Sequence, residues 1–219
     1  GNSGYAARST DNGATWSPLL RGLNSGSTST GFLFVSTDNA GVWVAVGNSG
    51  YAVRSTDNGD TWSPLIKGLN SGSVSAVFNS VSTDNAGVWV AVATSGYAAR
   101  STDNGVTWSA LPTGLNSGLA TASFNSVNTD NAGVWVAVAA AGRASRSTDN
   151  GATWTALPLG LNSGSPNIYL YSVATNNTGT WIAVAASGYA ARSTDNGATW
   201  SPLPVGLIEY NPYLTVNTI

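Results

Sequence analysis

Arg8–Trp16 reads RSTDNGATW, and this string returns with at most one exchange at Arg54–Trp62, Arg100–Trp108, Arg146–Trp154 and Arg192–Trp200. Each copy begins 46 residues after the previous one. A second string, GVWVAV or GTWIAV, repeats with the same spacing and is centred on Trp43, Trp89, Trp135 and Trp181. A constant period of this length indicates a repeat architecture.

One repeat unit predicts four short strands separated by polar turns. In the second full unit we expect strands over 77–82, 88–92, 97–101 and 107–111, where Val, Thr, Trp and Tyr are frequent. Asp-Asn-Ala-Gly, Thr-Ser-Gly and Asp-Asn-Gly separate these segments and favour turns. Four antiparallel strands in each unit are typical of a propeller blade. The sequence therefore predicts an all-β fold, a five-bladed β-propeller.

The repeats predict a single domain over 1–219 with one incomplete blade. The complete blades are expected at about 31–70, 76–116, 122–162 and 168–207. The closing blade would combine 1–20 with 208–219, and it lacks the segment that corresponds to STDNAGVWVAV in the other units. Five full units need 230 residues, eleven more than the 219 of the chain. We therefore expect the closing blade to lack its second strand.

Three arrangements would satisfy the edges of this incomplete blade. Residues 213–219 could pair directly with Tyr5–Ser9, which gives a three-stranded closing blade. Another chain or another segment could donate the strand, or the ring could stay open and continue into a neighbouring molecule. We expect the three-stranded closure because it needs no partner.

The repeated string resembles a known family. Ser9–Trp16 matches the S-x-D-x-G-x-x-W pattern of the Asp-box, or bacterial neuraminidase repeat, as do the other four copies. The preceding Arg and the T-D-N-G-x-T-W form are also similar to repeats of the photosystem II assembly-factor propellers. The resemblance implies that each box forms the turn between the third and fourth strands of a blade. It implies no activity, because such boxes occur in sialidases, other hydrolases, lectin-like proteins and scaffolds.

Within each box the Asp and the Trp have expected structural roles. The carboxylate can fold back onto N–H groups of its own turn, and the indole can pack between sheets. The Asp-box residues with these roles are Asp11, Asp57, Asp103, Asp149 and Asp195 with Trp16, Trp62, Trp108, Trp154 and Trp200. Sugar stacking is the other interpretation of the Trp residues, and repeat positions favour the core.

The composition excludes several classes of function. Charged residues make up 8% of the chain and the net charge is −2, so a nucleic-acid partner is not expected. The chain has no His and no Cys, which removes the usual ligands of zinc, haem and iron–sulfur clusters. We expect no metal and no cofactor. The apolar runs are also far shorter than a membrane span.

The acidic residues do not form a recognisable catalytic set. A glycosidase needs paired carboxylates, or a Tyr nucleophile with acid–base help, at one centre. Only Asp60 and Glu209 depart from the repeat, and the singular basic residues are Arg21, Lys67 and Arg143. We therefore predict that the chain is not an enzyme and assign no catalytic residue.

Two other repeated features allow more than one interpretation. The box arginines could bind acidic groups together, or each could pair with an Asp of its own or an adjacent blade, which we favour. These turn-pairing arginines are Arg8, Arg54, Arg100, Arg146 and Arg192. The Gly-Leu-Asn-Ser-Gly segments fit a lectin loop and an ordinary connection equally well, at 22–26, 68–72, 114–118 and 160–164.

These observations favour a non-enzymatic recognition or structural module of a secreted surface protein or phage fibre, located outside the cell or on the virion surface. Its partner would be a protein or glycan surface, with assembly through the incomplete blade as a further route. A multivalent glycan-binding lectin is the alternative, and an Asp-box glycoside hydrolase is less favoured. The repeats assign no ligand-binding residue. Specificity is expected where the units differ, at Phe32, Phe34, Tyr169, Tyr171 and 209–213.

Overall fold

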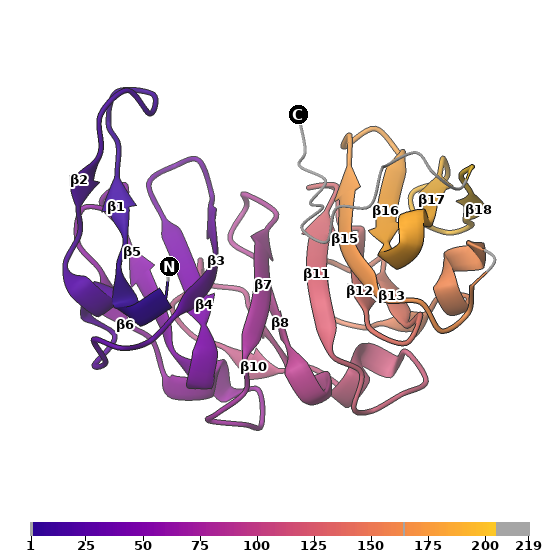
Figure 1. The fold of residues 1–219 in the computed structure, drawn as a ribbon, viewed down its shortest axis with the longest axis horizontal. Coiled ribbons are helices and arrows are strands. Elements are labelled where there is room, and N and C mark those ends of the chain that lie inside the picture. The colour runs from indigo at the N-terminus through magenta and orange to yellow at the C-terminus, as the bar shows by residue number, and fades with distance from the viewer. Residues whose placement is uncertain (1, 164, 205–219) are drawn as a thin grey trace.

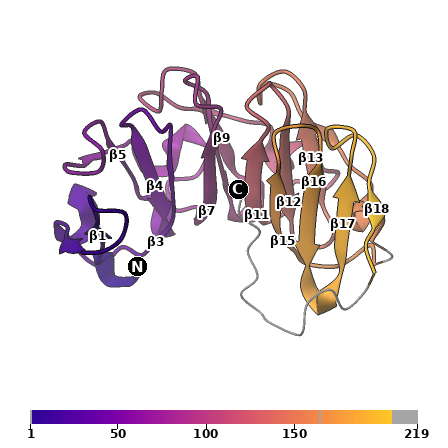
Figure 2. The same cartoon turned by 90° about the horizontal axis from the view of Figure 1, so that it is seen from above.

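The computed structural model describes residues 2–163 and 165–204. Within this part of the chain the strands form five antiparallel sheets, four with four strands and one with two. The sheets follow one another along the chain as blades around an arc, seen from two directions in Figures 1 and 2. The prediction of an all-β, five-bladed propeller is confirmed.

Each blade takes its strands in chain order from the inside of the arc outward. Blade 1 is β1 (Ala7–Arg8) and β2 (Ser17–Pro18). Blade 2 is β3 (Phe32–Thr37), β4 (Trp43–Gly47), β5 (Ala52–Ser55) and β6 (Ser63–Pro64). Blade 3 is β7 (Phe78–Thr83), β8 (Trp89–Ala93), β9 (Ala98–Ser101) and β10 (Ser109–Ala110). Blade 4 is β11 (Phe124–Thr129), β12 (Trp135–Ala139), β13 (Ala144–Ser147) and β14 (Thr155–Ala156). Blade 5 is β15 (Leu170–Thr175), β16 (Trp181–Ala185), β17 (Ala190–Ser193) and β18 (Ser201–Pro202).

The observed strands of blade 3 lie within one or two residues of the expected segments, except that β10 is only two residues long. In this blade Val90 of β8 pairs with Arg100 of β9, and Ala91 pairs with Ala99. A register shift between Phe78 and Ser80 marks a bulge near the start of β7. The other complete blades repeat this register and this bulge.

The turns use left-handed backbone at many Gly and Asn positions, and also at repeated Ser and Leu positions such as Ser95 and Leu69. Gly96, between β8 and β9, has φ +76°, and a β-carbon there would lie 1.8 Å from the carbonyl oxygen of Ala120. No side chain fits at such an approach, so this turn requires glycine. One-turn 3-10 segments occupy such turns and the connections between blades, at Asn2–Gly4, Arg21–Asn24, Asn48–Gly50, Lys67–Asn70, Thr94–Gly96, Thr113–Asn116, Leu159–Asn162 and Ala186–Gly188.

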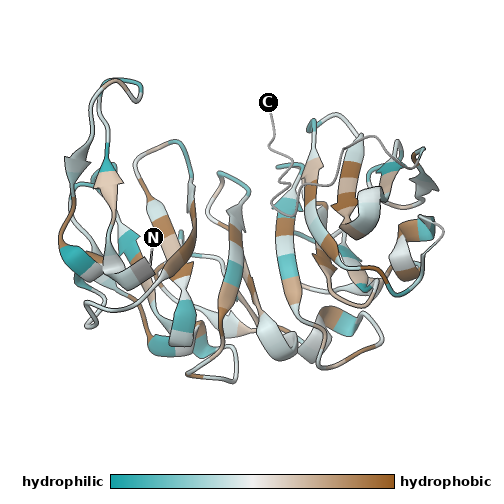
Figure 3. Cartoon of the chain, viewed as in Figure 1, coloured by the Kyte–Doolittle hydropathy of each residue, from teal (hydrophilic) through white to brown (hydrophobic). Residues whose placement is uncertain are grey.

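The hydrophobic core lies between the faces of neighbouring blades. Val44 and Val46 of β4 pack in one cluster with Trp89 of β8, and equivalent clusters join blades 3 and 4 and blades 4 and 5. Figure 3 shows the hydrophobic segments mainly on the strands. Each blade therefore needs the next blade to bury its apolar face. No helix of the described residues could cross a membrane.

Blade 1 is described only by its two outer strands. The closing strand expected over 213–219, and its pairing with Tyr5–Ser9, lie outside the described residues. In Figure 1, β1 and β2 lie at one end of the arc and β15–β18 at the other.

Candidate functional site

The Asp-box is a closed local hydrogen-bond system, as blade 3 shows. The Asp103 carboxylate accepts from the Ser101 hydroxyl at 2.8 Å, from the Thr107 N–H at 2.8 Å and from the Thr107 hydroxyl at 2.6 Å. The Ser101 hydroxyl oxygen accepts in turn from the Gly105 N–H at 3.0 Å. Asp103 thus connects both ends of the turn between β9 and β10.

The other four boxes repeat these contacts. In each, the Asp accepts from the N–H and hydroxyl of the Thr four residues later, as at Asp11, Asp57, Asp149 and Asp195. The box Trp donates its indole N–H to the carbonyl of the box Gly, at 3.0 Å for Trp108. The structure therefore places every box Asp on the N–H groups of its own turn.

These hydrogen bonds favour the ionised carboxylate. The Thr199 hydroxyl, then the Thr199 N–H and the Ser193 hydroxyl, lower the pKa of Asp195 to about 2. The same kinds of donor lower the pKa of Asp57 and Asp11 to about 2. A carboxyl group with this pKa is ionised at neutral pH and cannot serve there as a general acid.

The box Asn joins neighbouring blades, a role that the sequence interpretation missed. Asn104 of blade 3 has φ +57°, and its carbonyl accepts from Arg54 Nε of blade 2 at 2.8 Å. Its amide donates to Asp38 of blade 2 at 3.1 Å and accepts from the Trp89 indole at 2.8 Å. One residue thus holds the preceding blade at two points.

The expected pairing of the repeated arginines with Asp occurs at Arg8, whereas Arg54, Arg100 and Arg146 bond a backbone carbonyl instead. Arg8, Arg54, Arg100 and Arg146 each donate from Nε to the backbone carbonyl of the box Asn in the next blade. The only ion pair among the described residues joins Arg8 to Asp60, at 3.2 Å. The box Asp already accepts from its own turn, which leaves the Asn carbonyl as the acceptor that the Arg reaches. Arg192 of blade 5 is exposed, and its side chain has no hydrogen bond within the described residues.

Asp38, Asp84 and Asp130 are buried, which the repeat pattern alone did not indicate. Asp38 accepts from the N–H groups of Ala40 and Val42 in the turn between β3 and β4. Burial alone would raise the pKa of Asp38, but hydrogen bonds from Ala40, Asn104 and Val42 outweigh burial and lower it. The sequence shows that this Asp and the box Asn recur at fixed spacing, but not that Asn104 of the next blade bonds Asp38.

The Gly-Leu-Asn-Ser-Gly segments connect blades rather than presenting free side chains. Leu69 is fully buried, and Asn70 donates from its amide to the Trp108 carbonyl of the next blade at 3.0 Å. The same Asn-to-Trp bond occurs at the other three segments, from Asn24, Asn116 and Asn162. Of the two interpretations, the structure supports the inter-blade connection.

A hollow of mixed lining, about 330 Å³ in volume, lies where the innermost strands β3, β7, β11 and β15 face one another. Valines alternate in its wall with Ser, Thr and Asn groups, and we call it the polar hollow to distinguish it from the more apolar hollow described below. Ser82, Ser126, Asn128 and Ser172 contribute polar groups to its wall, and Phe34 contributes an aromatic ring. Tyr169 and Tyr171, also at the innermost strand of their blade, are exposed. Of the positions at which specificity was expected, Phe32, Phe34 and Tyr171 therefore lie on innermost strands, and Tyr169 directly precedes one.

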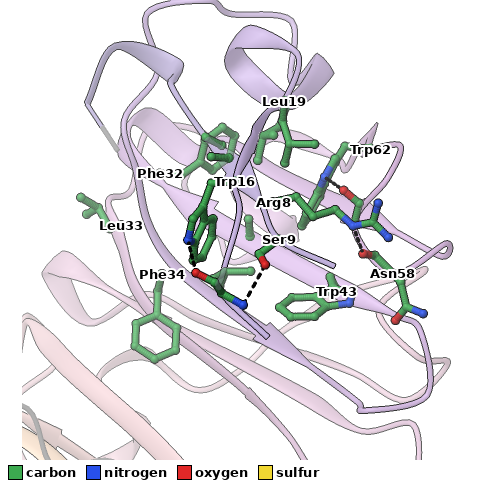
Figure 4. A pocket seen from close by; sticks show the side chains of 17 residues that line it. Arg8, Ser9, Trp16, Leu19, Phe32, Leu33, Phe34, Trp43, Asn58 and Trp62 are labelled. Carbon is green, nitrogen blue, oxygen red and sulfur yellow. Dashed lines mark hydrogen bonds between the residues drawn. The ribbon is translucent and has the colours of Figure 1, made fainter. Parts of the chain in front are cut away.

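A second hollow, of about 540 Å³, lies between blade 1 and blade 2. Figure 4 shows Trp16, Phe34, Trp43 and Trp62 around it, and the lining is mostly apolar. The indole N–H of Trp43 is buried without a hydrogen-bond partner in the described structure. This hollow is mostly apolar and lies beside β1.

The described residues contain no group of three or more His, Cys, Asp or Glu that could hold a metal ion. Glu209, the only Glu, and the rest of the segment 209–213 lie outside the described residues. The described acidic side chains serve turns or the Arg8–Asp60 pair. The geometry can therefore bind and orient through backbone and hydroxyl groups, but it brings no pair of free carboxylates together.

The sequence model of the BNR/Asp-box repeat family matches residues 7–18, 53–64, 99–110 and 191–202. The chain carries BNR/Asp-box repeats. The fourth box, around Asp149, lies outside these matches and yet makes the same hydrogen bonds. No curated protein matches the chain in sequence.

Solved structures confirm that this BNR-repeat chain has a propeller fold. YCF48 from Cyanidioschyzon merolae is 20% identical with a TM-score of 0.62, over 92% of this chain and 68% of that one. YCF48 bound to D1 peptide is 21% identical with a TM-score of 0.59, over 79% of this chain. The present chain spans about half of that structure, 53% of its length. The Niastella koreensis GH74 enzyme is 19% identical with a TM-score of 0.71, over 94% of this chain and 35% of that one.

Proposed function

We propose that this BNR-repeat propeller is a non-enzymatic recognition module that binds a protein partner at the polar hollow between its inner strands. The observation that carries the proposal is the engagement of the box carboxylates. Each accepts at least three hydrogen bonds inside its own turn, and four of them have a pKa of about 2. Carboxylates held in this way are neither free nucleophiles nor general acids at neutral pH.

The inner strands support a peptide-like partner. Ser126 already accepts from the Val173 N–H, and Asn128 bonds the Val173 carbonyl and the Thr129 N–H. The Ser82 hydroxyl and the remaining donor of Ser126 can bond a peptide backbone, and Phe34 offers apolar contact beside them. A propeller of similar fold, YCF48, has been solved bound to D1 peptide. Low charge and many small polar residues support a place outside the cell or on a virion surface, as the composition suggested.

The partner class is tested by selecting peptides from a random library on the wild-type chain. Ser82→Arg puts a long charged side chain into the polar hollow and should weaken the selected peptides about tenfold or more. Ser109→Arg makes the same change on the exposed outer strand β10 and should leave binding unchanged. Equal binding by both variants would contradict the site. Binding on a glycan array without any peptide binder would favour the lectin alternative.

The absence of catalysis is tested separately. Aryl glycosides, including a sialoside, should show no turnover above the buffer rate. Turnover that disappears in Glu209→Gln would overturn this part of the proposal and identify Glu209 as the acid–base residue.

A further inference from the structure

The two faces of the arc are built from different turns. Strands follow one another antiparallel in each complete sheet, so the turns after the first and third strands lie on one face, which we call the box face. The turns after the second strands and the connections between blades lie on the opposite face, the connection face. Hydrogen bonds within each face agree with this grouping, from the Asn58 N–H to the Gly41 carbonyl and from the Gly160 N–H to the Gly142 carbonyl.

The charged side chains are divided unequally between these faces. The acidic residues of the described chain all lie in turns of the box face, at Asp11, Asp38, Asp57, Asp60, Asp84, Asp103, Asp130, Asp149 and Asp195. The repeated arginines lie near the same turns, at the ends of the third strands. The three remaining basic residues, Arg21, Lys67 and Arg143, lie on the connection face. Within the described residues this face therefore carries cations and no carboxylate.

Two of these cations are held against tyrosine rings. Arg21 Cζ lies 4.8 Å from the centre of the Tyr5 ring, and Lys67 Nζ lies 4.6 Å from the centre of the Tyr51 ring. Arg21 and Lys67 are both exposed. Each therefore presents its charge to solvent from a defined position on the connection face.

The connection face also presents apolar side chains at equivalent positions. Leu20, Ile66, Pro112 and Pro158 are 46 residues apart, and all four are exposed. Because the blades repeat around one axis, equivalent residues lie at the same height on the face. Leu20 directly precedes Arg21, and Ile66 directly precedes Lys67. The face therefore combines a level row of apolar side chains with adjacent cations.

We propose that the connection face binds the surface of an anionic lipid bilayer. Arg21, Lys67 and Arg143 lie among the headgroups, where an anionic membrane attracts each Lys or Arg. Leu20 and Ile66 reach the boundary with the acyl chains, as the apolar side chains of interfacial segments do. The box face, with its excess of Asp over Arg, points away from the membrane.

The aliphatic side chains favour a bilayer over a soluble acidic polymer as the partner. The cations alone would attract any polyanion, but a polysaccharide offers Leu20 and Ile66 no apolar medium. A level row of side chains also fits a plane better than it fits a single flexible chain. Membrane binding goes beyond the peptide recognition proposed for the polar hollow and uses other residues, so either can fail without the other.

Co-sedimentation with vesicles tests the role of charge. The chain should bind vesicles of equal parts phosphatidylserine and phosphatidylcholine about tenfold more tightly than phosphatidylcholine alone, and salt should weaken this binding. Lys67→Glu reverses a charge on the connection face and should weaken binding about tenfold. Arg192→Glu makes the same change at an exposed residue near the box face and should leave binding unchanged. Equal losses in both variants would overturn the proposed orientation.

The apolar contribution has an equally close control. Ile66 and Val106 are both 55% exposed, but Val106 lies in a box turn. Ile66→Ser should weaken vesicle binding about fivefold, and Val106→Ser should not change it. Because the chain has no cysteine, Ile66→Cys and Val106→Cys can each carry one environment-sensitive dye. The emission should shift to the blue on vesicles at position 66 and stay unchanged at position 106.

Four outcomes would overturn the proposal. Absence of binding to anionic vesicles, or equal binding to both kinds of vesicle, would remove the charge-dependent contact. Unchanged binding by Ile66→Ser, with equally tight binding of dextran sulfate, would identify a site for acidic polymers instead. A dye shift at both positions would contradict the orientation. The urea midpoints of the variants should stay near that of the wild type, because every substituted side chain is exposed, so a loss of binding would not reflect unfolding.

Discussion

Trp16 and Trp108 occupy the same position of the same box, and their environments differ completely. Both indoles donate to the carbonyl of their box glycine, at 3.1 and 3.0 Å. Trp16 is nevertheless 65% exposed, whereas Trp108 is 2% exposed. The hydrogen bonds of the box therefore depend only on its own nine residues, whereas the burial of its indole depends on the neighbouring blade.

The burial of the box Trp also differs between blade 2, which follows the incomplete blade, and blades 3, 4 and 5. Blades 3, 4 and 5 each pack a box Trp against the blade before them, through Trp108, Trp154 and Trp200. Blade 2 follows an incomplete blade, and its Trp62 is only half-buried. Repeat proteins gain stability from such nearest-neighbour interfaces in addition to the units themselves. Substitutions at matched positions can separate the two contributions.

The largest difference is expected at the indole. Trp108→Ala empties a buried site between blades 2 and 3 and should lower the free energy of unfolding by about 3–5 kcal/mol. Trp16→Ala removes a mostly exposed ring and should lower it by less than about 1 kcal/mol. Urea unfolding followed by far-UV circular dichroism measures both without relying on Trp fluorescence. Equal losses would mean that Trp16 is packed against a neighbour in solution.

The box glycine should show a smaller difference. Gly105 and Gly13 both have positive φ, +79° and +85°, so Ala strains either turn by about 1–2 kcal/mol. A β-carbon at Gly105 also meets Val44 Cγ2 at 3.1 Å, whereas at Gly13 nothing lies closer than 4.0 Å. Gly105→Ala should therefore cost about 1 kcal/mol more than Gly13→Ala.

A double-mutant cycle identifies the source of that excess. In a Val44→Ala background, which removes the γ-carbons, the cost of Gly105→Ala should fall to that of Gly13→Ala. An unchanged cost would show that the excess comes from the backbone of the turn rather than from the blade interface.

The contrast also explains what the sequence could predict. The box contacts lie within nine residues, so the roles of Ser101, Asp103 and Thr107 follow from turn chemistry alone. The period of 46 then gives the number of blades. By contrast, the acceptor of Arg54 is the carbonyl of Asn104, fifty residues away in the next blade. A periodic sequence does not reveal which unit supplies a partner, because every unit offers the same groups.

Departures from the repeat were less predictable still. Nothing in the residues around Trp16 distinguishes it from Trp108, because its exposure follows from the strands beside it. Asp38 looks like an ordinary turn residue, and it is buried because Asn104 of the next blade covers it. Both features depend on contacts between units, which require coordinates.

The box carboxylate should contribute a similar free energy of unfolding in complete blades and in blade 1, because its hydrogen bonds lie within its own turn. Asp103→Ala leaves the Thr107 N–H, the Thr107 hydroxyl and the Ser101 hydroxyl without their acceptor, and should cost about 1–3 kcal/mol. Peptide binding should persist, because the box lies outside the polar hollow. Asp60→Ala is the matched control, since the hydrogen bonds and ion pairs of its side chain among the described residues are limited to Arg8. A variant that melts like the wild type but no longer binds would reverse the structural assignment.

Lowering the pH should remove the difference in stability between the wild type and Asp103→Ala. Burial acts to raise the pKa of Asp103, but hydrogen bonds from Thr107 and Ser101 outweigh burial and lower it. A lowered pKa stabilises the fold fully above the unfolded value of about 4, and this contribution is lost as pH falls through the folded value. The melting temperatures of the two proteins should therefore converge below about pH 4. A difference that persisted into strong acid would point to a packing effect instead.

The smallest effect is expected at the inter-blade arginine, and it bears directly on the ends of the arc. Arg100 donates from Nε to the Asn150 carbonyl of the next blade at 2.8 Å. Lysine has no donor at that point of the side chain, so Arg100→Lys should cost about 1 kcal/mol. Arg192 occupies the same position in blade 5 and is exposed, and its side chain has no hydrogen bond among the described residues. Arg192→Lys should therefore leave the urea midpoint unchanged.

The reverse result would have a specific meaning. Each bonded arginine finds its acceptor in the box fifty residues later, and in a closed ring of five units the counterpart for Arg192 is Asn12. If Arg192→Lys cost as much as Arg100→Lys, Arg192 would be bonded in solution, and blade 5 would lie against blade 1. Trp16→Ala would then be costly as well, because the same contact would bury its indole. Measuring both variants together therefore shows whether the protein in solution is an open arc or a ring in which blade 5 contacts blade 1.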